Sequence, residues 1–144
     1  MIKIICIGKI KEGYLKEGIE DYYKRISKYH KINIIELNDS NINDEAKEIE
    51  RYIESKDYVI SLAIEGEEIS SIELSNKIDK IFINYSNITF IIGGSDGIHE
   101  RIKNNSNYKL SFSKMTYPHG FFRLILLEQI YRSFKIINNE TYHK

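Results

Sequence analysis

The sequence predicts an α/β protein in which helices cover both faces of a mostly parallel sheet. Short apolar runs alternate with longer runs of helical periodicity along the whole chain, and this alternation is typical of βαβ units. Several of the short runs are apolar throughout, as expected for strands buried on both faces of a parallel sheet. A chain of 144 residues is expected to form a single domain, 1–144, with five or six strands.

In the first half of the chain, the apolar run 2–8 predicts the first strand. A helix is expected at 13–29, where apolar side chains recur at helical spacing (Leu15, Ile19, Tyr22, Tyr23 and Ile26). The run 31–37 predicts the second strand. An acidic helix with a thin apolar stripe is expected at 43–54, and a fully apolar third strand at 58–64.

In the second half, a helix is expected from about residue 71 to 84, followed by a buried strand at 88–92. A glycine-rich loop then leads into a short helix at about 96–104, and 108–113 predicts the fifth strand. The last helix is long, at about 117–137. Helix start signals support these positions: Ser70 or Ser71 with Glu73 for the first of these helices, and Thr116 with Pro118 for the last.

The composition is that of a folded protein, with 42% apolar and 29% charged residues. No apolar run approaches the length needed to cross a bilayer. The only cysteine, Cys6, lies within an apolar run, so the composition favours neither an internal disulfide nor a metal cluster. We therefore expect a cytoplasmic protein without a membrane partner and without a bound metal.

The net charge is zero, which at first argues against a nucleic-acid partner. The charges are unevenly distributed, however. Residues 1–85 carry 13 Lys/Arg and 17 Asp/Glu. Residues 86–144 carry 8 Lys/Arg and 4 Asp/Glu, together with three of the four histidines. This distribution makes the C-terminal part the better candidate for a surface that faces an anion.

Three loops at strand ends are the expected ligand site. In parallel sheets, ligands bind beyond the carboxyl ends of the strands. The corresponding segments here are Leu62–Gly66, Gly93–Gly97 and Phe112–Tyr117. We expect them to share one pocket.

The glycine-rich loop Gly93–Gly97 matches the G-x-S-x-G pattern of a hydrolase nucleophile elbow, with Ser95 at the nucleophile position. An acid followed by a histidine would complete a triad, and Glu128 or Glu140 with His143 formally provides it. An α/β-hydrolase, however, needs a larger sheet and an HGGG-type oxyanion segment, which is absent. A serine esterase is therefore the least favoured function.

The same loop fits neither phosphate-binding fingerprint. A dinucleotide motif would need glycine at position 91 or 95, and a Walker loop would need Lys followed by Ser or Thr after Gly97. Two interpretations remain open: Gly93, Gly94 and Gly97 let the main chain approach a ligand, or they form a tight turn without one.

Two residues near the start of the last helix are candidate functional residues. His119 lies near the end of a connection, residues 111–120, that is rich in hydroxyl side chains. Arg123 lies within an apolar arc of the helix, where a charge needs either a partner or a polar site. Glu128, Arg132 and Lys135 lie on the opposite side. The arc is wider than one sheet face can cover, so we expect self-association as a two-fold dimer.

Several long segments together resemble one protein family. These are FIIGGSDGIH, SNYKLSFSKMTYPH, FFRLILLEQIYRSFKI, the terminal TYHK and the opening IKIICIGKIKEGYLKEGIEDYYKRI. In this order they are similar to the RlmH (YbeA) family of SPOUT-class ribosomal RNA large subunit methyltransferases. The resemblance covers nearly the whole chain. The clearest difference is a segment around residues 39–45 that is shorter than in the family.

The resemblance implies a SPOUT methyltransferase fold with a C-terminal trefoil knot, which is an exception to the rule against threaded chains. It also implies a homodimer and S-adenosyl-L-methionine as methyl donor. The implied reaction is methylation at N3 of a pseudouridine in the 23S rRNA of assembled 70S ribosomes. A ribosome- or RNA-binding factor without catalysis remains the alternative.

The resemblance also implies roles for individual residues. The implied cofactor contacts are Leu62, Gly93, Phe112, Ser113, Lys114, Met115, Thr116 and Tyr117. His119 and His143 are the candidates for the general base, and Arg123 is implied to hold a phosphate or the base carbonyl. The implied RNA-binding tail is Tyr142, His143 and Lys144, which would reach the partner's pocket.

Overall fold

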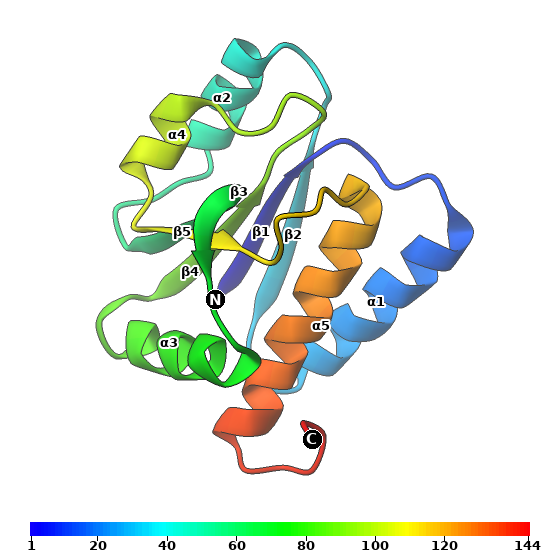
Figure 1. Cartoon of the computed structure of the whole chain (residues 1–144), viewed down its shortest axis with the longest axis vertical. Coiled ribbons are helices and arrows are strands. Elements are labelled where there is room, and N and C mark those ends of the chain that lie inside the picture. Colours follow the sequence, from blue (N-terminus) through cyan, green and yellow to red (C-terminus); the bar gives the residue numbers. More distant parts are fainter.

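The computed structural model describes all residues from 1 to 144 and contains one parallel sheet (Figure 1). Its five strands have the order β2-β1-β4-β3-β5, which confirms the predicted class and strand number. The strands are β1 (Ile2–Ile7), β2 (Ile32–Leu37), β3 (Asp57–Glu68), β4 (Asn87–Ile92) and β5 (Tyr108–Ser111). Every pairing is parallel.

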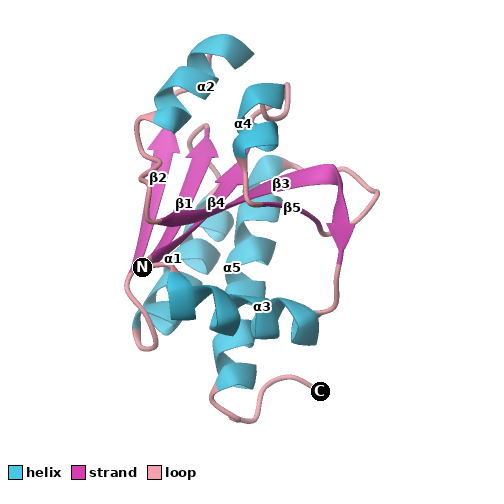
Figure 2. Ribbon diagram, turned by 90° about the vertical axis from the view of Figure 1, so that its left-hand side faces the viewer, coloured by secondary structure: helices cyan, strands magenta, loops and turns pink.

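Helices cover both faces of the sheet (Figure 2). They are α1 (Gly13–Ser27), α2 (Ile42–Glu50), α3 (Ser71–Asn84), α4 (Glu100–Asn105) and α5 (His119–Ile137). On one face, α1, α3 and α5 contribute to a core cluster with Ile4 and Phe90. On the other face, α2 and α4 pack with Ile5 and Ile91 in a second cluster. Because neighbouring residues of a strand point to opposite faces, β1 and β4 are buried on both sides.

The predicted start of α3 is confirmed, but the starts of α4 and α5 are not where the sequence pattern predicted them. Ser70 and Glu73 form a reciprocal capping box at α3. The short helix begins at Glu100, because residues 94–97 form a turn before it. The last helix begins at His119 with Pro118 as its N-cap residue in an extended conformation, so Thr116 does not cap it.

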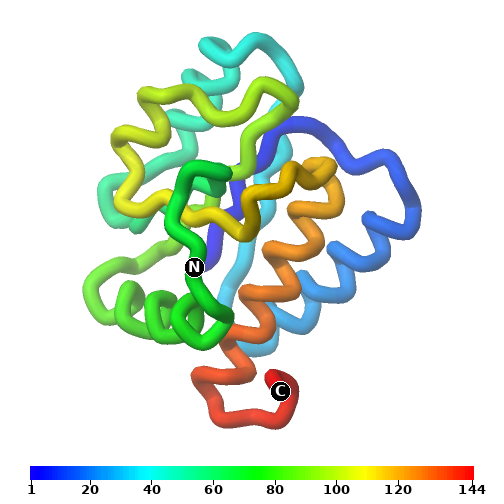
Figure 3. The backbone as a smooth tube through the Cα atoms, viewed as in Figure 1, coloured from blue at the N-terminus to red at the C-terminus, as the bar shows by residue number.

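Strand β3 is longer than predicted and crosses β5. It continues to Glu68 rather than ending at residue 64, and both Leu62 and Glu67 pair with Leu110. The intervening residues bulge over β5, and a Cβ at Gly66 would lie 2.7 Å from the carbonyl carbon and oxygen of Lys109. Only glycine permits this close crossing. The segment leading from β3 to α3 lies in front of the chain around β5 in Figure 3, an arrangement consistent with the implied trefoil knot.

A buried polar network joins the amino ends of β1, β3 and β4. The Lys3 ammonium lies 2.6 Å from the Asp57 carboxylate, and both side chains are buried. The same carboxylate accepts hydrogen bonds from Asn87 at 2.7 Å and Thr89 at 3.1 Å. Removing one member would leave the other charge buried without its partner, which is more costly than losing an exposed ion pair.

We expect Asp57→Asn to lower the free energy of unfolding by about 3–5 kcal/mol at pH 7, measured by urea denaturation. Burial alone raises the pKa of Asp57, but hydrogen bonds from Lys3, the Glu54 amide and Asn87 outweigh it, so the pKa lies below its usual value. The stabilisation is therefore complete above the unfolded-state pKa of about 3.9 and is lost as the pH falls through the lower folded-state pKa. The difference in the free energy of unfolding between variant and wild type should become smaller below that pH. A difference that does not depend on pH would contradict this explanation.

Candidate functional site

A pocket of about 240 Å³ lies beyond the carboxyl ends of β4 and β5, beside the bulge of β3. The three predicted loops therefore converge, although Leu62 lies within β3 and not at its end. The predicted cofactor residues that line the pocket are Leu62, Gly93, Phe112, Ser113, Met115, Thr116 and Tyr117. Lys114 is exposed and does not line it.

Glu65 and Lys103 supply opposite charges to the pocket lining. Their side chains form an ion pair at 2.6 Å, which connects the bulge of β3 to helix α4. The hydrogen bond from Lys103 lowers the pKa of Glu65. No sequence pattern indicates this pair, because the two residues are 38 positions apart.

The glycine loop forms a tight turn against the pocket. The Gly97 amide donates to the Gly94 carbonyl at 3.0 Å, and Gly97 has a φ of +77°. A Cβ at Gly93 would lie 2.5 Å from the carbonyl carbon and oxygen of Gly97. The two arms of the turn can therefore touch only because position 93 has no side chain.

Ser95 is exposed at the tip of this turn and does not line the pocket. A nucleophile elbow places its serine between a strand and the helix that directly follows it. Here the helix begins only at Glu100, and no hydrogen bond joins Ser95 to a histidine. The geometry gives the esterase interpretation no support.

The third loop is held by hydrogen bonds of its own. The Ser111 hydroxyl donates to the Ser113 carbonyl, and the Met115 amide donates to the Ser113 hydroxyl, both at 3.0 Å. Phe122 packs against Phe112, with ring centroids 5.1 Å apart. Met115 is 74% exposed although it lines the pocket. An apolar side chain is thus available to cover a bound ligand.

His119 and Arg123 lie on successive turns of α5 but have different surroundings. His119 lines the pocket. Arg123 does not line this pocket and is only 1% exposed. Its guanidinium forms an ion pair with Glu36 at 2.5 Å and donates to the Gly8 carbonyl at 3.1 Å. The predicted need for a partner is therefore met by Glu36, 87 positions away in the sequence.

The tail folds back on the far end of α5. Tyr142 donates to Glu128 at 3.0 Å, and Arg132 lies 3.1 Å from Nδ1 of His143 and pairs with Glu128 at 2.5 Å. Burial and hydrogen bonding, including the bond to Glu128, raise the pKa of Tyr142. Lys144 is exposed beyond this cluster. Glu128 was considered only as a formal triad acid and Arg132 only as part of a polar helix face, and their spacing of four residues is the only local signal of the ion pair.

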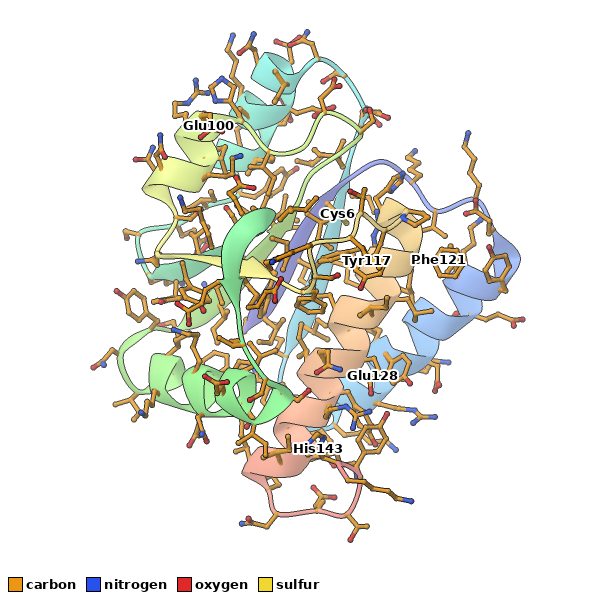
Figure 4. All side chains as sticks on the ribbon, viewed as in Figure 1. Cys6, Glu100, Tyr117, Phe121, Glu128 and His143 are labelled. Carbon is orange, nitrogen blue, oxygen red and sulfur yellow. The ribbon has the colours of Figure 1, made fainter.

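Within one chain, the tail and the pocket lie at opposite ends of α5. Figure 4 shows Tyr117 near the start of this helix and His143 beyond its end. A helix of 19 residues is about 28 Å long at a rise of about 1.5 Å per residue. His119 and His143 of the same chain are therefore not brought together.

Other types of site find little support in the structure. Burial raises the pKa of the Cys6 thiol to about 11, so this cysteine is protonated at neutral pH. No group of three His, Cys, Asp or Glu side chains could hold a metal ion. No helix combines the length and hydropathy that crossing a membrane requires.

Known proteins match both the sequence and the fold. A family model described as predicted SPOUT methyltransferase matches residues 1–143. Proteins named ribosomal RNA large subunit methyltransferase H from Clostridium tetani and Clostridium botulinum are 47% and 49% identical to this chain, and each alignment covers 99% of both proteins.

Solved structures share the fold at low sequence identity. A probable methylase family protein from Haemophilus influenzae superposes with a TM-score of 0.60 at 11% identity, covering 99% of this chain and 70% of that one. The SpoU methyltransferase AviRb from Streptomyces viridochromogenes, solved with the cofactor AdoMet, superposes with a TM-score of 0.51 at 8% identity. The match covers 90% of this chain and 56% of that one.

The parallel sheet with helices on both faces is that of a SPOUT-type methyltransferase fold, as the family model and the solved structures indicate. The relatives that are 47% and 49% identical over nearly their full length define the family within this class of methyltransferases. The chain belongs to the ribosomal RNA large subunit methyltransferase H (RlmH) family. The family expected from the sequence motifs is confirmed.

Proposed function

We propose that this protein transfers a methyl group from S-adenosyl-L-methionine to N3 of a pseudouridine in the 23S rRNA of assembled 70S ribosomes. Membership of a family whose relatives are named rRNA large subunit methyltransferases supports the general reaction. The observation that carries the proposal is the convergence of the three strand-end loops on one pocket. These are the loops that the resemblance implies for the methyl donor.

The pocket has features that fit this cofactor. Gly93 lets the glycine turn close tightly where it forms one wall of the pocket, and Leu62, Ile92 and Phe112 supply apolar surface for a heterocycle. Ser113 and Thr116 add hydroxyl groups. When bound, the cofactor supplies an activated methyl group on a sulfonium, so the transfer itself does not need a metal or a covalent protein intermediate.

The chain's own residues would orient the base and remove the proton from N3. Positioning of this kind can lower a barrier by about 7–11 kcal/mol in favourable cases, and a general base adds about 10²–10⁴-fold. His119 is the candidate inside the pocket. His143 is the second candidate, but its distance from the pocket of its own chain means that a second protomer would have to bring it.

A homodimer in which each tail completes the partner's pocket would satisfy this requirement. Apolar surface for such an interface is available, because Phe121 on α5 is 42% exposed and contacts Tyr14 on α1, which is 60% exposed. In the proposed dimer, Tyr142, His143 and Lys144 contact the RNA. A local basic patch and the shape of the ribosome would then compensate for the zero net charge of the chain.

Two measurements test this function. We expect S-adenosylmethionine to bind in a calorimetric titration, and labelled methyl groups to appear on 23S rRNA when 70S ribosomes are the substrate but poorly with free rRNA. Absence of cofactor binding would contradict the proposal, and efficient turnover of a short stem-loop would contradict the ribosome requirement.

The alternatives predict other results. A non-catalytic factor would bind ribosomes equally well with and without the cofactor and would transfer no methyl group. An esterase would hydrolyse a chromogenic ester and react with a serine probe at Ser95.

A further inference from the structure

His119 and Arg123 contact the same residue from two directions. They are four positions apart on α5 and therefore lie on one face of the helix. A Cβ at Gly8 would lie 3.3 Å from Cε1 of the His119 ring, so the edge of the ring lies beside Gly8, next to the space that a side chain there would need. Arg123 donates a hydrogen bond to the carbonyl of that same glycine at 3.1 Å.

Gly8 is held on both sides by hydrogen bonds. Its amide donates to the Leu37 carbonyl at 2.7 Å, while its carbonyl accepts from Arg123. Its φ of +93° is a backbone conformation that favours glycine. The surface against which the His119 ring packs is therefore a fixed peptide and not a mobile loop.

Glu36 completes this arrangement at the end of β2. The carboxylate oxygen that pairs with Arg123 at 2.5 Å also lies 3.4 Å from the Ile10 amide. One carboxylate thus connects β2, the β1–α1 loop and α5. The planar guanidinium can reach Glu36 and Gly8 at once because its donors form a fork, which a lysine ammonium cannot reproduce.

His119 is exposed and its side chain makes no hydrogen bond within the chain, so its position beside Gly8 is the constraint on the ring that the chain provides. Within the chain Arg123 is only 1% exposed, and its charge is already paired with Glu36. We propose that Arg123 is a positioning residue that acts through the Gly8 peptide to hold the His119 ring in the pocket. The catalytic part of this inference rests on the proposed function of the pocket.

The test compares Arg123→Met and Arg123→Lys with a matched control, Lys3→Met. Lys3 is also a buried cation paired with a carboxylate, but it lies at the opposite end of β1. The first readout is the NMR signals of the four imidazoles in the protein without cofactor, with the His119 signals assigned through His119→Gln. The second is a kinetic profile of methyl transfer to ribosomes against pH.

In both Arg123 variants we expect the His119 signals to move while those of His30, His99 and His143 stay in place. We expect kcat to fall about tenfold to a hundredfold with cofactor affinity within about threefold, because misplacement of a reacting group affects the transition state more than ground-state binding. The pH profile should change in the Arg123 variants. In Lys3→Met, stability should fall without a change in the His119 signals or the pH profile.

Unmoved His119 signals in both Arg123 variants would overturn the inference, as would a loss of activity explained entirely by weaker cofactor binding. Arg123→Lys keeps a positive charge beside Glu36, so it remains a usable test variant if Arg123→Met does not fold. The NMR readout requires neither cofactor nor ribosomes. Failure of the proposed function would appear separately, as a wild-type protein that neither binds S-adenosylmethionine nor transfers a methyl group.

Discussion

Gly93→Ala is expected to weaken the binding of S-adenosylmethionine by up to about a hundredfold, because its Cβ would overpack the glycine loop at a cost of about 1–3 kcal/mol. The added carbon would lie 2.5 Å from the main chain of Gly97 and 2.9 Å from the Ile98 side chain. Backbone atoms cannot rotate away as a flexible side chain can. The turn that forms one wall of the pocket must therefore open or shift.

The measurement is a calorimetric titration of the cofactor, accompanied by a melting curve. Gly13→Ala is the matched control, since a Cβ there has no atom within 4 Å and replaces glycine in the first position of α1. The control should bind the cofactor like the wild type and should unfold at the same or a higher temperature. If Gly93→Ala binds the cofactor as well as Gly13→Ala does, this turn is not a wall of the cofactor site.

Alanine at the histidine that acts as general base is expected to slow methyl transfer by about 10²–10⁴-fold. His119 lies in the pocket and His143 lies beyond the far end of α5. Single variants at both positions, assayed on 70S ribosomes, decide between them. His99→Ala is the control, because His99 caps α4 and does not line the pocket. Full activity in both His119→Ala and His143→Ala would contradict the acid–base proposal.

If both variants are impaired, mixed dimers show whether the site is shared between protomers. A dimer purified with His119→Ala in one protomer and His143→Ala in the other would contain one pocket and one tail that are both intact and that meet each other. Since a two-fold dimer has two equivalent sites, such hybrids should recover about half of the wild-type rate. Hybrids as inactive as their parents would contradict a pocket completed by the partner's tail.

Much of the fold could be predicted because it depends on local periodicity. All five strands and all five helices appear near their expected positions, since a fully apolar run and a helical stripe are each properties of neighbouring residues. The edge of the sheet that holds the pocket followed from the same reasoning, because carboxyl ends of parallel strands lie together. The capping box at Ser70 was equally local.

The largest error in the predicted strand boundaries lies where a distant segment decides the local conformation. Strand β3 continues past residue 64 because it crosses β5, and at Gly66 the neighbouring atoms belong to Lys109 and Leu110. No pattern within 58–68 indicates that crossing. The late start of α4 has a different, local cause: the tight turn at Gly94–Gly97, which closes against Gly93, occupies the positions where the helix was expected to begin.

The class of fold, the order of the elements, the three loops of the pocket and, from its long motifs, the family could all be inferred from the amino-acid sequence. The partners of the charged residues could not. Glu36 is the partner of Arg123, Gly8 lies between Arg123 and His119, and the tail packs on Glu128 and Arg132. Periodicity shows which face of an element is buried, whereas the partner of a buried charge depends on which distant elements the topology places beside it.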